Sequence, residues 1–131
     1  MIKGENQMKF YVCSHCGNIV AFTNNAGVPI MCCGQKMAEL VPNTVEASAE
    51  KHLPVISQEG NIVTVTVGSV DHPMGEEHLI DWVALEPQQG NQRKQLIVDG
   101  EPKVQFALVE DDAVVAAYAY CTLHGLWKTE A

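Results

Sequence analysis

Residues 61–67, NIVTVTV, alternate apolar and hydroxyl-bearing side chains with a period of two. In an extended chain, Val63, Val65 and Val67 lie on one face and the intervening threonines lie on the other. β-branched residues of this kind are also the ones that strands favour. The stretch therefore predicts a half-buried β-strand.

The period-two pattern runs through the rest of the chain from Pro54 onwards. Further strands are predicted where Ile80, Trp82 and Ala84 alternate with Asp81, Val83 and Leu85, at Val104, Phe106 and Leu108, and along the run from Ala113 to Tyr120. Turn residues separate these strands at positions 59–60, 89–91, 99–100 and 110–112. Several short strands between regular turns, with no convincing amphipathic helix, predict an all-β antiparallel sandwich or barrel.

A short Cys-rich segment, roughly residues 8–40, precedes this β region. Its apolar pieces, at residues 10–12, 19–22 and 28–31, have the length of strands and are too short for helices. So few residues cannot bury enough surface to be stable alone. We therefore expect a metal, disulfides or a partner chain to stabilise the segment.

The change from Cys-rich to period-two sequence predicts two domains. The first, at residues 1–42, is a small metal-binding domain in which residues 1–7 form a loose extension. The second, at residues 43–131, is the antiparallel β-sandwich. The polar residues 42–49 between them predict a linker.

The composition excludes several classes of function. The chain has 16 acidic and 8 basic residues and a formal charge of −8, which is a poor electrostatic footprint for binding nucleic acid. Its longest apolar run, residues 113–121, is far shorter than the roughly 20 residues that span a membrane. The opening residues, MIKGENQMKFYV, lack the apolar core of a secretory signal. We expect a cytoplasmic protein with no nucleic-acid or membrane partner.

Four of the five cysteines form a spaced set. Cys13 and Cys16 make a C-x-x-C pair, and the adjacent Cys32 and Cys33 follow after fifteen residues. Four thiolates that converge tetrahedrally bind zinc or iron, so the set predicts either an iron centre or a zinc knuckle that only stabilises the segment. Neighbouring side chains on an extended strand point to opposite faces, so ligation by both Cys32 and Cys33 requires a local kink. We expect His15 to be exposed and not a ligand.

The remaining cysteine and the four remaining histidines form a second set in the β region. The set comprises His52, His72, His78, Cys121 and His124. Each lies in or beside a turn or strand end, where loops converge, and the last two form a C-x-x-H pair. Five nitrogen and sulfur ligands are too many for a structural zinc, which takes four. Five such ligands with one open position fit a redox iron better.

These motifs resemble the desulfoferrodoxin family over almost the whole chain. The resemblance rests on C-x-x-C…CC at residues 13–33, Glu50-Lys-His52 before Leu-Pro-Val-Ile, Gly68-Ser-Val-Asp-His72-Pro-Met, Glu76-Glu-His78 with Trp82 downstream, and Tyr120-Cys-Thr-Leu-His-Gly-Leu-Trp127-Lys. Thr122 stands where relatives often have asparagine. The first part resembles desulforedoxin, a rubredoxin-like module with iron held by four thiolates. The remainder resembles the immunoglobulin-like sandwich of the one-iron enzyme neelaredoxin.

The resemblance implies a homodimeric superoxide reductase with two irons per chain, although zinc is possible in the four-cysteine site of the purified protein. It implies that the four histidines bind the catalytic iron equatorially, that Cys121 binds it axially, and that the sixth position is open. Glu50 then occupies the open position in the resting ferric state, and Lys51 draws in and orients superoxide. An external donor such as rubredoxin supplies the electron. We expect the backbone amides of Leu123 and His124 to tune the charge on the Cys121 sulfur.

Two other functions compete with this interpretation. The chain could be a non-enzymatic electron-transfer protein that works through its four-thiolate iron centre. It could also be a dismutase, which requires that superoxide itself re-reduce the iron and that oxygen be released. The open sixth position and Lys51 argue against the electron carrier, and a measurement of oxygen release separates the reductase from the dismutase.

Overall fold

The computed structural model describes residues 8–68 and 72–131. The expected loose extension at residues 1–7, and residues 69–71 of the Gly68–Met74 motif, lie outside the described residues. The chain forms two compact units that divide between Val41 and Pro42, and each is described by itself. Within the described ranges, no helix has the length and apolar character needed to cross a bilayer.

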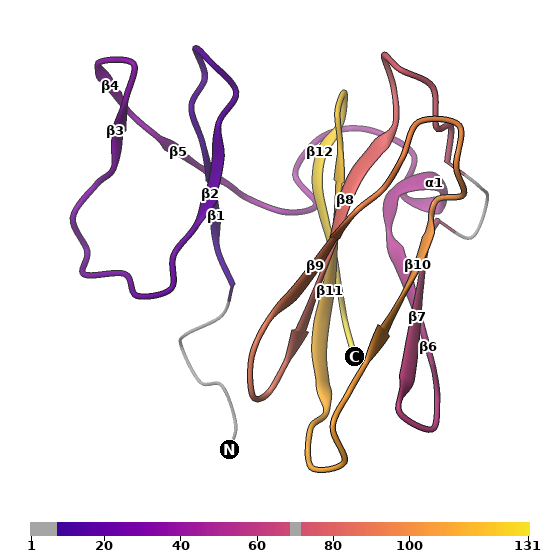
Figure 1. Cartoon of the computed structure of the whole chain (residues 1–131). Coiled ribbons are helices and arrows are strands. Elements are labelled where there is room, and N and C mark those ends of the chain that lie inside the picture. The colour runs from indigo at the N-terminus through magenta and orange to yellow at the C-terminus, as the bar shows by residue number, and fades with distance from the viewer. Residues whose placement is uncertain (1–7, 69–71) are drawn as a thin grey trace. The chain divides into compact units, whose positions relative to one another are not determined.

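The first unit consists of short strands joined by turns and loops (Figure 1). Its strands are β1 (Phe10–Val12), β2 (Ile19–Ala21), β3 (Met31–Cys32), β4 (Gln35–Lys36) and β5 (Ala38–Leu40). One sheet has the order β2-β1-β5, and β3 and β4 form a separate antiparallel pair. The buried hydrophobic side chains among its described residues are Phe10, Cys13 and Met37. So small a core agrees with the expectation that this unit needs a stabilising element beyond apolar packing.

The strand expected at residues 28–31 is wrong except at its last residue. Residues 28–30 lie outside any strand, and β3 begins only at Met31. Pro29 has no N–H to donate to a neighbouring strand. Val28 is 70% exposed, so it gains nothing from an apolar layer. Apolar character alone therefore did not produce a strand here.

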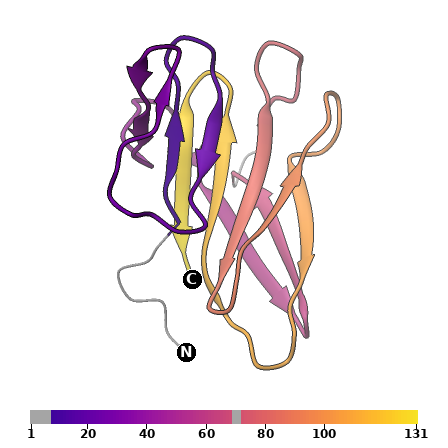
Figure 2. The same cartoon turned by 60° about the vertical axis from the view of Figure 1, so that its left-hand side comes forward.

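The second unit is an antiparallel sandwich of two sheets, which Figure 2 shows from a second side. Its strands are β6 (Pro54–Glu59), β7 (Ile62–Val67), β8 (Ile80–Pro87), β9 (Gln92–Gln95), β10 (Lys103–Ala107), β11 (Val114–Cys121) and β12 (Gly125–Glu130). One sheet has the order β10-β7-β6 and the other has the order β12-β11-β8-β9. The first, second and fifth strands thus share one sheet. This confirms the expected all-β fold with an immunoglobulin-like sandwich.

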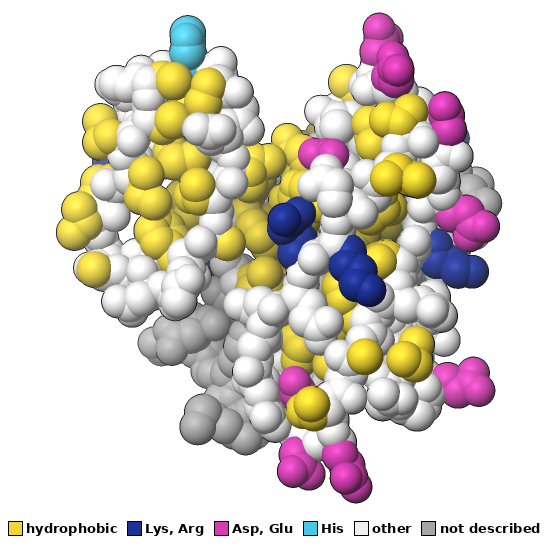
Figure 3. Space-filling view, viewed as in Figure 1, with side chains coloured by type: hydrophobic (Ala, Val, Ile, Leu, Met, Phe, Trp, Pro, Cys, Tyr) yellow, Lys and Arg dark blue, Asp and Glu magenta, His cyan; other side chains and the backbone are white. Residues whose placement is uncertain are grey.

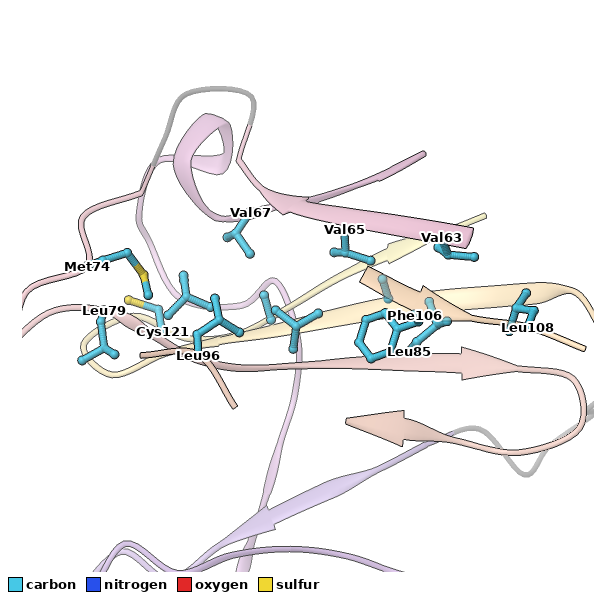
Figure 4. Close-up of a cluster of buried hydrophobic side chains, with 14 residues drawn as sticks. Val63, Val65, Val67, Met74, Leu79, Leu85, Leu96, Phe106, Leu108 and Cys121 are labelled. Carbon is cyan, nitrogen blue, oxygen red and sulfur yellow. The ribbon is translucent and has the colours of Figure 1, made fainter. Parts of the chain in front are cut away.

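The core lies between the two sheets (Figure 4). Val63, Val65 and Val67 have no exposed surface, so the predicted buried face of β7 is confirmed. The other main contributors to this core are Phe106 of β10, Val83 and Leu85 of β8, and Ala117, Ala119 and Cys121 of β11. Each large apolar side chain buried in this way contributes about 1.5–3 kcal/mol. Cys121 is part of this core, so its sulfur has no contact with bulk solvent.

The face expected for Ile80, the first residue of β8, is wrong. Ile80 belongs to the core cluster together with Val83 and Leu85, and not with Trp82. The register between β11 and β8 shifts after Tyr120, because Tyr120 pairs with Trp82 while Cys121 pairs with Ile80. Asp81 is therefore an extra residue in β8, a β-bulge that reverses the alternation. The bulge turns Ile80 toward the core beside Cys121.

The segment expected to be a linker is attached to the second unit at Asn43. The Asn43 side-chain amide donates to the Lys128 carbonyl at 3.1 Å and accepts from the Lys128 N–H at 2.9 Å. The Asn43 backbone N–H also donates to the carbonyl of Leu126 at 3.0 Å. An amide side chain can reproduce both halves of a backbone pairing in this way. Asn43 thus extends the hydrogen bonding of β12.

A single helical turn, α1 (Ala49–His52), follows this segment, although the sequence shows no helical periodicity. The Leu53 N–H donates to the Ala49 carbonyl at 3.0 Å and closes the turn. Leu53 itself is extended, as the residue before Pro54 must be. The proline therefore ends α1 and starts β6 at once, which places His52 at the end of the sandwich.

We predict that Gly125→Ala lowers the free energy of unfolding of the second unit by about 1–2 kcal/mol. Gly125 has a φ of +78°, and an added Cβ would lie 3.3 Å from Cγ2 of Val45. Urea unfolding of the metal-free protein, followed by tryptophan fluorescence, measures the effect, since both tryptophans (Trp82 and Trp127) lie in the second unit. Gly90→Ala is the matched control, because nothing lies within 4 Å of its Cβ. Equal losses in both variants would contradict the prediction.

Candidate metal centres

The sandwich topology brings the second set of predicted ligands to one end of the second unit. His52 is the last residue of α1, two residues before the start of β6, and His72 and His78 lie in the connection from β7 to β8. Cys121 is the last residue of β11, and His124 lies in the turn before β12. Because these strands are antiparallel, the start of β6, the end of β7, the start of β8 and the end of β11 lie at the same end of the sandwich. Residues far apart in the sequence therefore meet.

The ligand atoms of this set converge on one point. Those of His52, His72, His78 and Cys121 all lie within 4.8 Å of one another. Nε2 of His52 lies 3.2 Å from Nε2 of His72 and 3.2 Å from Nδ1 of His124. The Cys121 sulfur lies 3.4 Å from Nε2 of His72 and 3.7 Å from Nδ1 of His124. His124 thus joins the set through Nδ1.

These separations fit a metal ion. Two nitrogens each about 2.1 Å from a metal and at a right angle to each other lie about 3 Å apart, which is close to the two nitrogen separations of 3.2 Å. Nε2 of His78 is buried and has no hydrogen-bond partner among the described residues. A buried polar atom of this kind normally has a partner, and a cation at the point of convergence provides one. The donor set of imidazoles and one thiol suits iron.

Backbone carbonyls fix two of the imidazole rings. Nδ1 of His52 donates to the Ser48 carbonyl at 2.6 Å, and Nδ1 of His72 donates to the Pro73 carbonyl at 2.6 Å. A proton held on Nδ1 leaves the lone pair on Nε2, the atom that faces the centre. Ser48 lies four residues before His52 in the sequence, and the single turn of α1 brings its carbonyl next to the His52 ring.

Trp127 contacts two of the predicted ligands. Its ring stacks on His52, with centroids 4.9 Å apart and an interplanar angle of 23°. Its Nε1–H donates to the carbonyl of His124 at 3.1 Å. Trp127 is buried, so both contacts are shielded from water. One side chain therefore restrains the ring of His52 and the main chain of His124.

Burial sets the protonation states of the metal-free centre. It lowers the pKa of His72 to about 4 and also lowers the pKa values of His52 and His78, so these rings are neutral at pH 7. Burial raises the pKa of the Cys121 thiol, while the backbone amides of Leu123 and His124 oppose the rise. The rings are thus ready to bind a metal, and Cys121 releases a proton when it does so.

The four remaining cysteines also converge. The sulfurs of Cys13, Cys16, Cys32 and Cys33 lie within 4.8 Å of one another, and those of Cys16 and Cys32 are 3.6 Å apart. The N–H of Cys16 donates to the Cys13 sulfur at 3.4 Å, and this bond is the main cause that lowers the Cys13 pKa to about 6. The thiolate form that binds metal is thus favoured at Cys13, while side-chain hydrogen bonds with Cys16 and Cys13 raise the pKa values of Cys32 and Cys33.

The kink expected at the adjacent cysteines is present. Cys33 has a φ of 53° and Gly34 has a φ of 76°, and the two residues connect β3 to β4. Two consecutive positive φ values are those of a type I′ turn, the tight turn that joins two antiparallel strands. The turn takes Cys33 off the strand that carries Cys32, so both sulfurs can face the same point.

The other residues singled out from the sequence lie near these centres. His15 is exposed and is not part of the four-cysteine cluster, as expected. Glu50 and Lys51 are exposed on α1, directly before His52. Burial and the neighbouring histidines are the main causes that lower the pKa values of His52 and His78, and the positive charge of Lys51 adds a smaller contribution. The Lys51 charge therefore acts at the histidine centre.

Several groups that hold the ligands are not apparent from the sequence. The carbonyls of Ser48 and Pro73 are backbone atoms, so the residue types in the sequence do not indicate them. Trp127 appears in the sequence only as part of a motif. Its place two residues after Gly125, at the start of the strand that follows the C-x-x-H pair, is the one signal that could have indicated its contact with the site.

Comparisons with known proteins agree with this geometry. The family profile described as desulfoferrodoxin matches residues 44–130, and the profile of the desulfoferrodoxin N-terminal domain matches residues 5–40. The chain is 44% identical over 122 residues to a desulfoferrodoxin homolog of Archaeoglobus fulgidus, covering 93% of this chain and 96% of that one. It is 42% identical over 126 residues to a desulfoferrodoxin of Nitratidesulfovibrio vulgaris, covering 96% and 98%.

A solved structure gives the same result. The superoxide reductase from Treponema pallidum superposes with a TM-score of 0.81 at 40% sequence identity, covering 95% of this chain and 99% of that one. A match over 95% of this chain spans both of its units. Because the family profile covers well over half of the sequence, this chain belongs to the desulfoferrodoxin family.

Proposed function

We propose that this chain is a superoxide reductase that converts superoxide, one electron and two protons into hydrogen peroxide. The observation that carries the proposal is the convergence of four imidazoles and one buried thiol on a single point. His52, His72, His78, His124 and Cys121 would hold the catalytic iron. A second iron would be held in the first unit by the thiolates of Cys13, Cys16, Cys32 and Cys33, and zinc could take its place there.

When bound, the catalytic iron supplies the electron that superoxide accepts. The neutral imidazoles and the single thiolate leave a net positive charge at a ferrous centre, which favours an anionic substrate. The amides of Leu123 and His124 hydrogen-bond to the Cys121 sulfur and withdraw charge from it. The buried position of Cys121 keeps solvent away from the sulfur and protects it from side reactions.

Lys51 is the residue that would draw superoxide to the centre. The chain has a formal charge of −8, which repels an anion at long range. Figure 3 shows acidic side chains at both ends and along one side of the second unit, and basic ones across its middle. Exposed charges farther than about 8–10 Å away are largely screened at physiological salt. Lys51 directly precedes the ligand His52 on α1, so we expect its charge to act mainly on the last part of the approach.

The remaining assignments follow from the family. Glu50, next to Lys51 on α1, would bind the ferric iron at its open position between turnovers. The electron would come from a soluble donor such as rubredoxin, in the cytoplasm, and the functional unit would be a homodimer. The domain boundaries would be residues 1–42 for the desulforedoxin-like domain and 43–131 for the catalytic domain. Cys16 and Cys33 are exposed, which supports electron exchange between the four-thiolate centre and a partner.

The direct test of the reaction is its stoichiometry. The iron-loaded, pre-reduced protein is mixed with a known amount of superoxide, and hydrogen peroxide and oxygen are measured together. We expect one hydrogen peroxide for each superoxide consumed, one oxidised iron, and no oxygen. Oxygen release at half the superoxide consumed would identify a dismutase. Consumption of superoxide only through the four-thiolate centre would favour an electron-transfer protein.

We predict that Cys121→Ser abolishes the thiolate-to-iron charge-transfer band of the oxidised histidine centre. Cys121 is the only cysteine among the ligand atoms of that centre, so no other sulfur can produce the band. Visible absorption and EPR spectra of the oxidised protein measure it. Cys33→Ser is the control, because it alters the four-thiolate spectrum and leaves this band in place. A band that survives Cys121→Ser unchanged would show that the sulfur assignment is wrong.

We predict that Lys51→Ala lowers the second-order rate constant with superoxide by about ten-fold at low salt and flattens its dependence on ionic strength. The reason is the loss of a positive charge that acts at His52 and His78. Pulse radiolysis over a series of salt concentrations measures both effects.

Lys103→Ala is the matched control for Lys51→Ala. It makes the same change in net charge, but Lys103 lies on β10 with a half-exposed side chain 4.0 Å from Glu101. We expect its rate constant to stay within two-fold of the unchanged protein. If the rate constants of both variants fall by the same factor, the net charge of the protein and not the local charge governs the encounter with superoxide.

A further inference from the structure

The His78 ring is held differently from the rings of His52 and His72. Those two donate from Nδ1 to a backbone carbonyl, at 2.6 Å in each case. No such carbonyl contact fixes the His78 ring within residues 8–68 and 72–131. His78 lies at an isolated bridge to Gly75, and its N–H donates to the Gly75 carbonyl at 3.2 Å. Apart from its edge-to-face contacts with the rings of His72 and His124, the position of His78 is therefore set through its main chain.

Thr122 makes three hydrogen bonds to the main chain around His78. The Leu79 N–H donates to the Thr122 hydroxyl oxygen at 3.2 Å, and this hydroxyl donates to the Glu77 carbonyl at 3.5 Å. The Thr122 N–H donates to the Leu79 carbonyl at 3.0 Å. The hydroxyl therefore contacts the residues on both sides of His78, acting once as acceptor and once as donor.

We infer that Thr122 is a positioning residue for His78, because its hydroxyl holds the main chain on both sides of His78, whereas the Ser48 and Pro73 carbonyls hold the rings of His52 and His72 directly. The inference rests on the proposed metal centre. Thr122 directly follows Cys121, so the contact ties the loop that carries His78 to the turn that carries Cys121 and His124. A shift of either segment changes the distance between their ligand atoms. Groups that orient metal ligands in this way typically affect metal affinity by about 10–100-fold.

The position allows a clean substitution. Thr122 is exposed, so valine can replace it without filling or emptying the core. Threonine and valine have nearly the same shape, and the change removes the hydroxyl while it keeps β-branching. The backbone bond from the Thr122 N–H to Leu79 remains in the variant. Thr122→Ser keeps the hydroxyl and loses only the methyl group, so it separates hydrogen bonding from packing.

Three readouts test the inference, and one of them needs no metal. In the metal-free protein, hydrogen exchange of the Leu79 amide should be at least ten-fold faster in Thr122→Val, because the amide loses its acceptor. In the iron-loaded protein, loss of ferrous iron from the histidine centre to a chelator should be about ten-fold faster. The charge-transfer band of the oxidised centre should also shift or broaden. Thr122→Ser should restore all three properties.

Thr129→Val is the matched control, since it makes the same chemical change on β12 away from the Cys121–His124 turn. It should leave iron loss and Leu79 exchange unchanged. Equal iron retention and equal spectra in Thr122→Val and the unchanged protein would overturn the inference. So would a Thr122→Ser variant that behaves like Thr122→Val. If the unchanged protein binds no iron at the histidines, the proposed function fails, and this outcome is distinct because it appears before any substitution.

Discussion

Buried imidazole nitrogens must be paired, and the end of this sandwich holds several that face one another. Leaving such a nitrogen unsatisfied costs about 1–3 kcal/mol, and Nε2 of His78 has no partner in the described part of the chain. His52 and His72 present their Nε2 atoms to each other at 3.2 Å, with both Nδ1 protons already used. One cation at the shared point satisfies every one of these atoms. The fold around the centre supplies the burial that keeps the rings neutral.

Much of this arrangement could be predicted from the sequence. The period-two pattern at Val63–Val67 predicted the buried face of β7 correctly, because a strand buried on one face has apolar residues at every second position. The ligands could be grouped because histidine and cysteine are chemically distinctive and lie at strand ends. Antiparallel strands then bring those ends together. The kink at Cys32 and Cys33 followed from strand geometry alone, and the structure has it as a tight turn.

The rest could not be predicted, since it depends on contacts that residue type does not encode. The bulge at Asp81 puts Ile80 on the face opposite to Trp82, and it arises from pairing with β11 and not from any local signal. The turn α1 has too few residues to show a period, yet it supplies the Ser48 carbonyl to His52. The segment before it was expected to be a linker because its residues are polar. The Asn43 amide instead pairs with the main chain of β12.

The most direct test of the central claim is iron X-ray absorption on the iron-loaded Cys13→Ser protein, in which the signal comes from the histidine centre alone. The geometry predicts an iron with four nitrogen ligands at about 2.1 Å and one sulfur ligand at about 2.3 Å. All five of these ligands lie in the second unit, so disruption of the four-cysteine set should leave the centre occupied. An iron surrounded only by oxygen and nitrogen atoms, or a protein that retains no iron, would contradict the account.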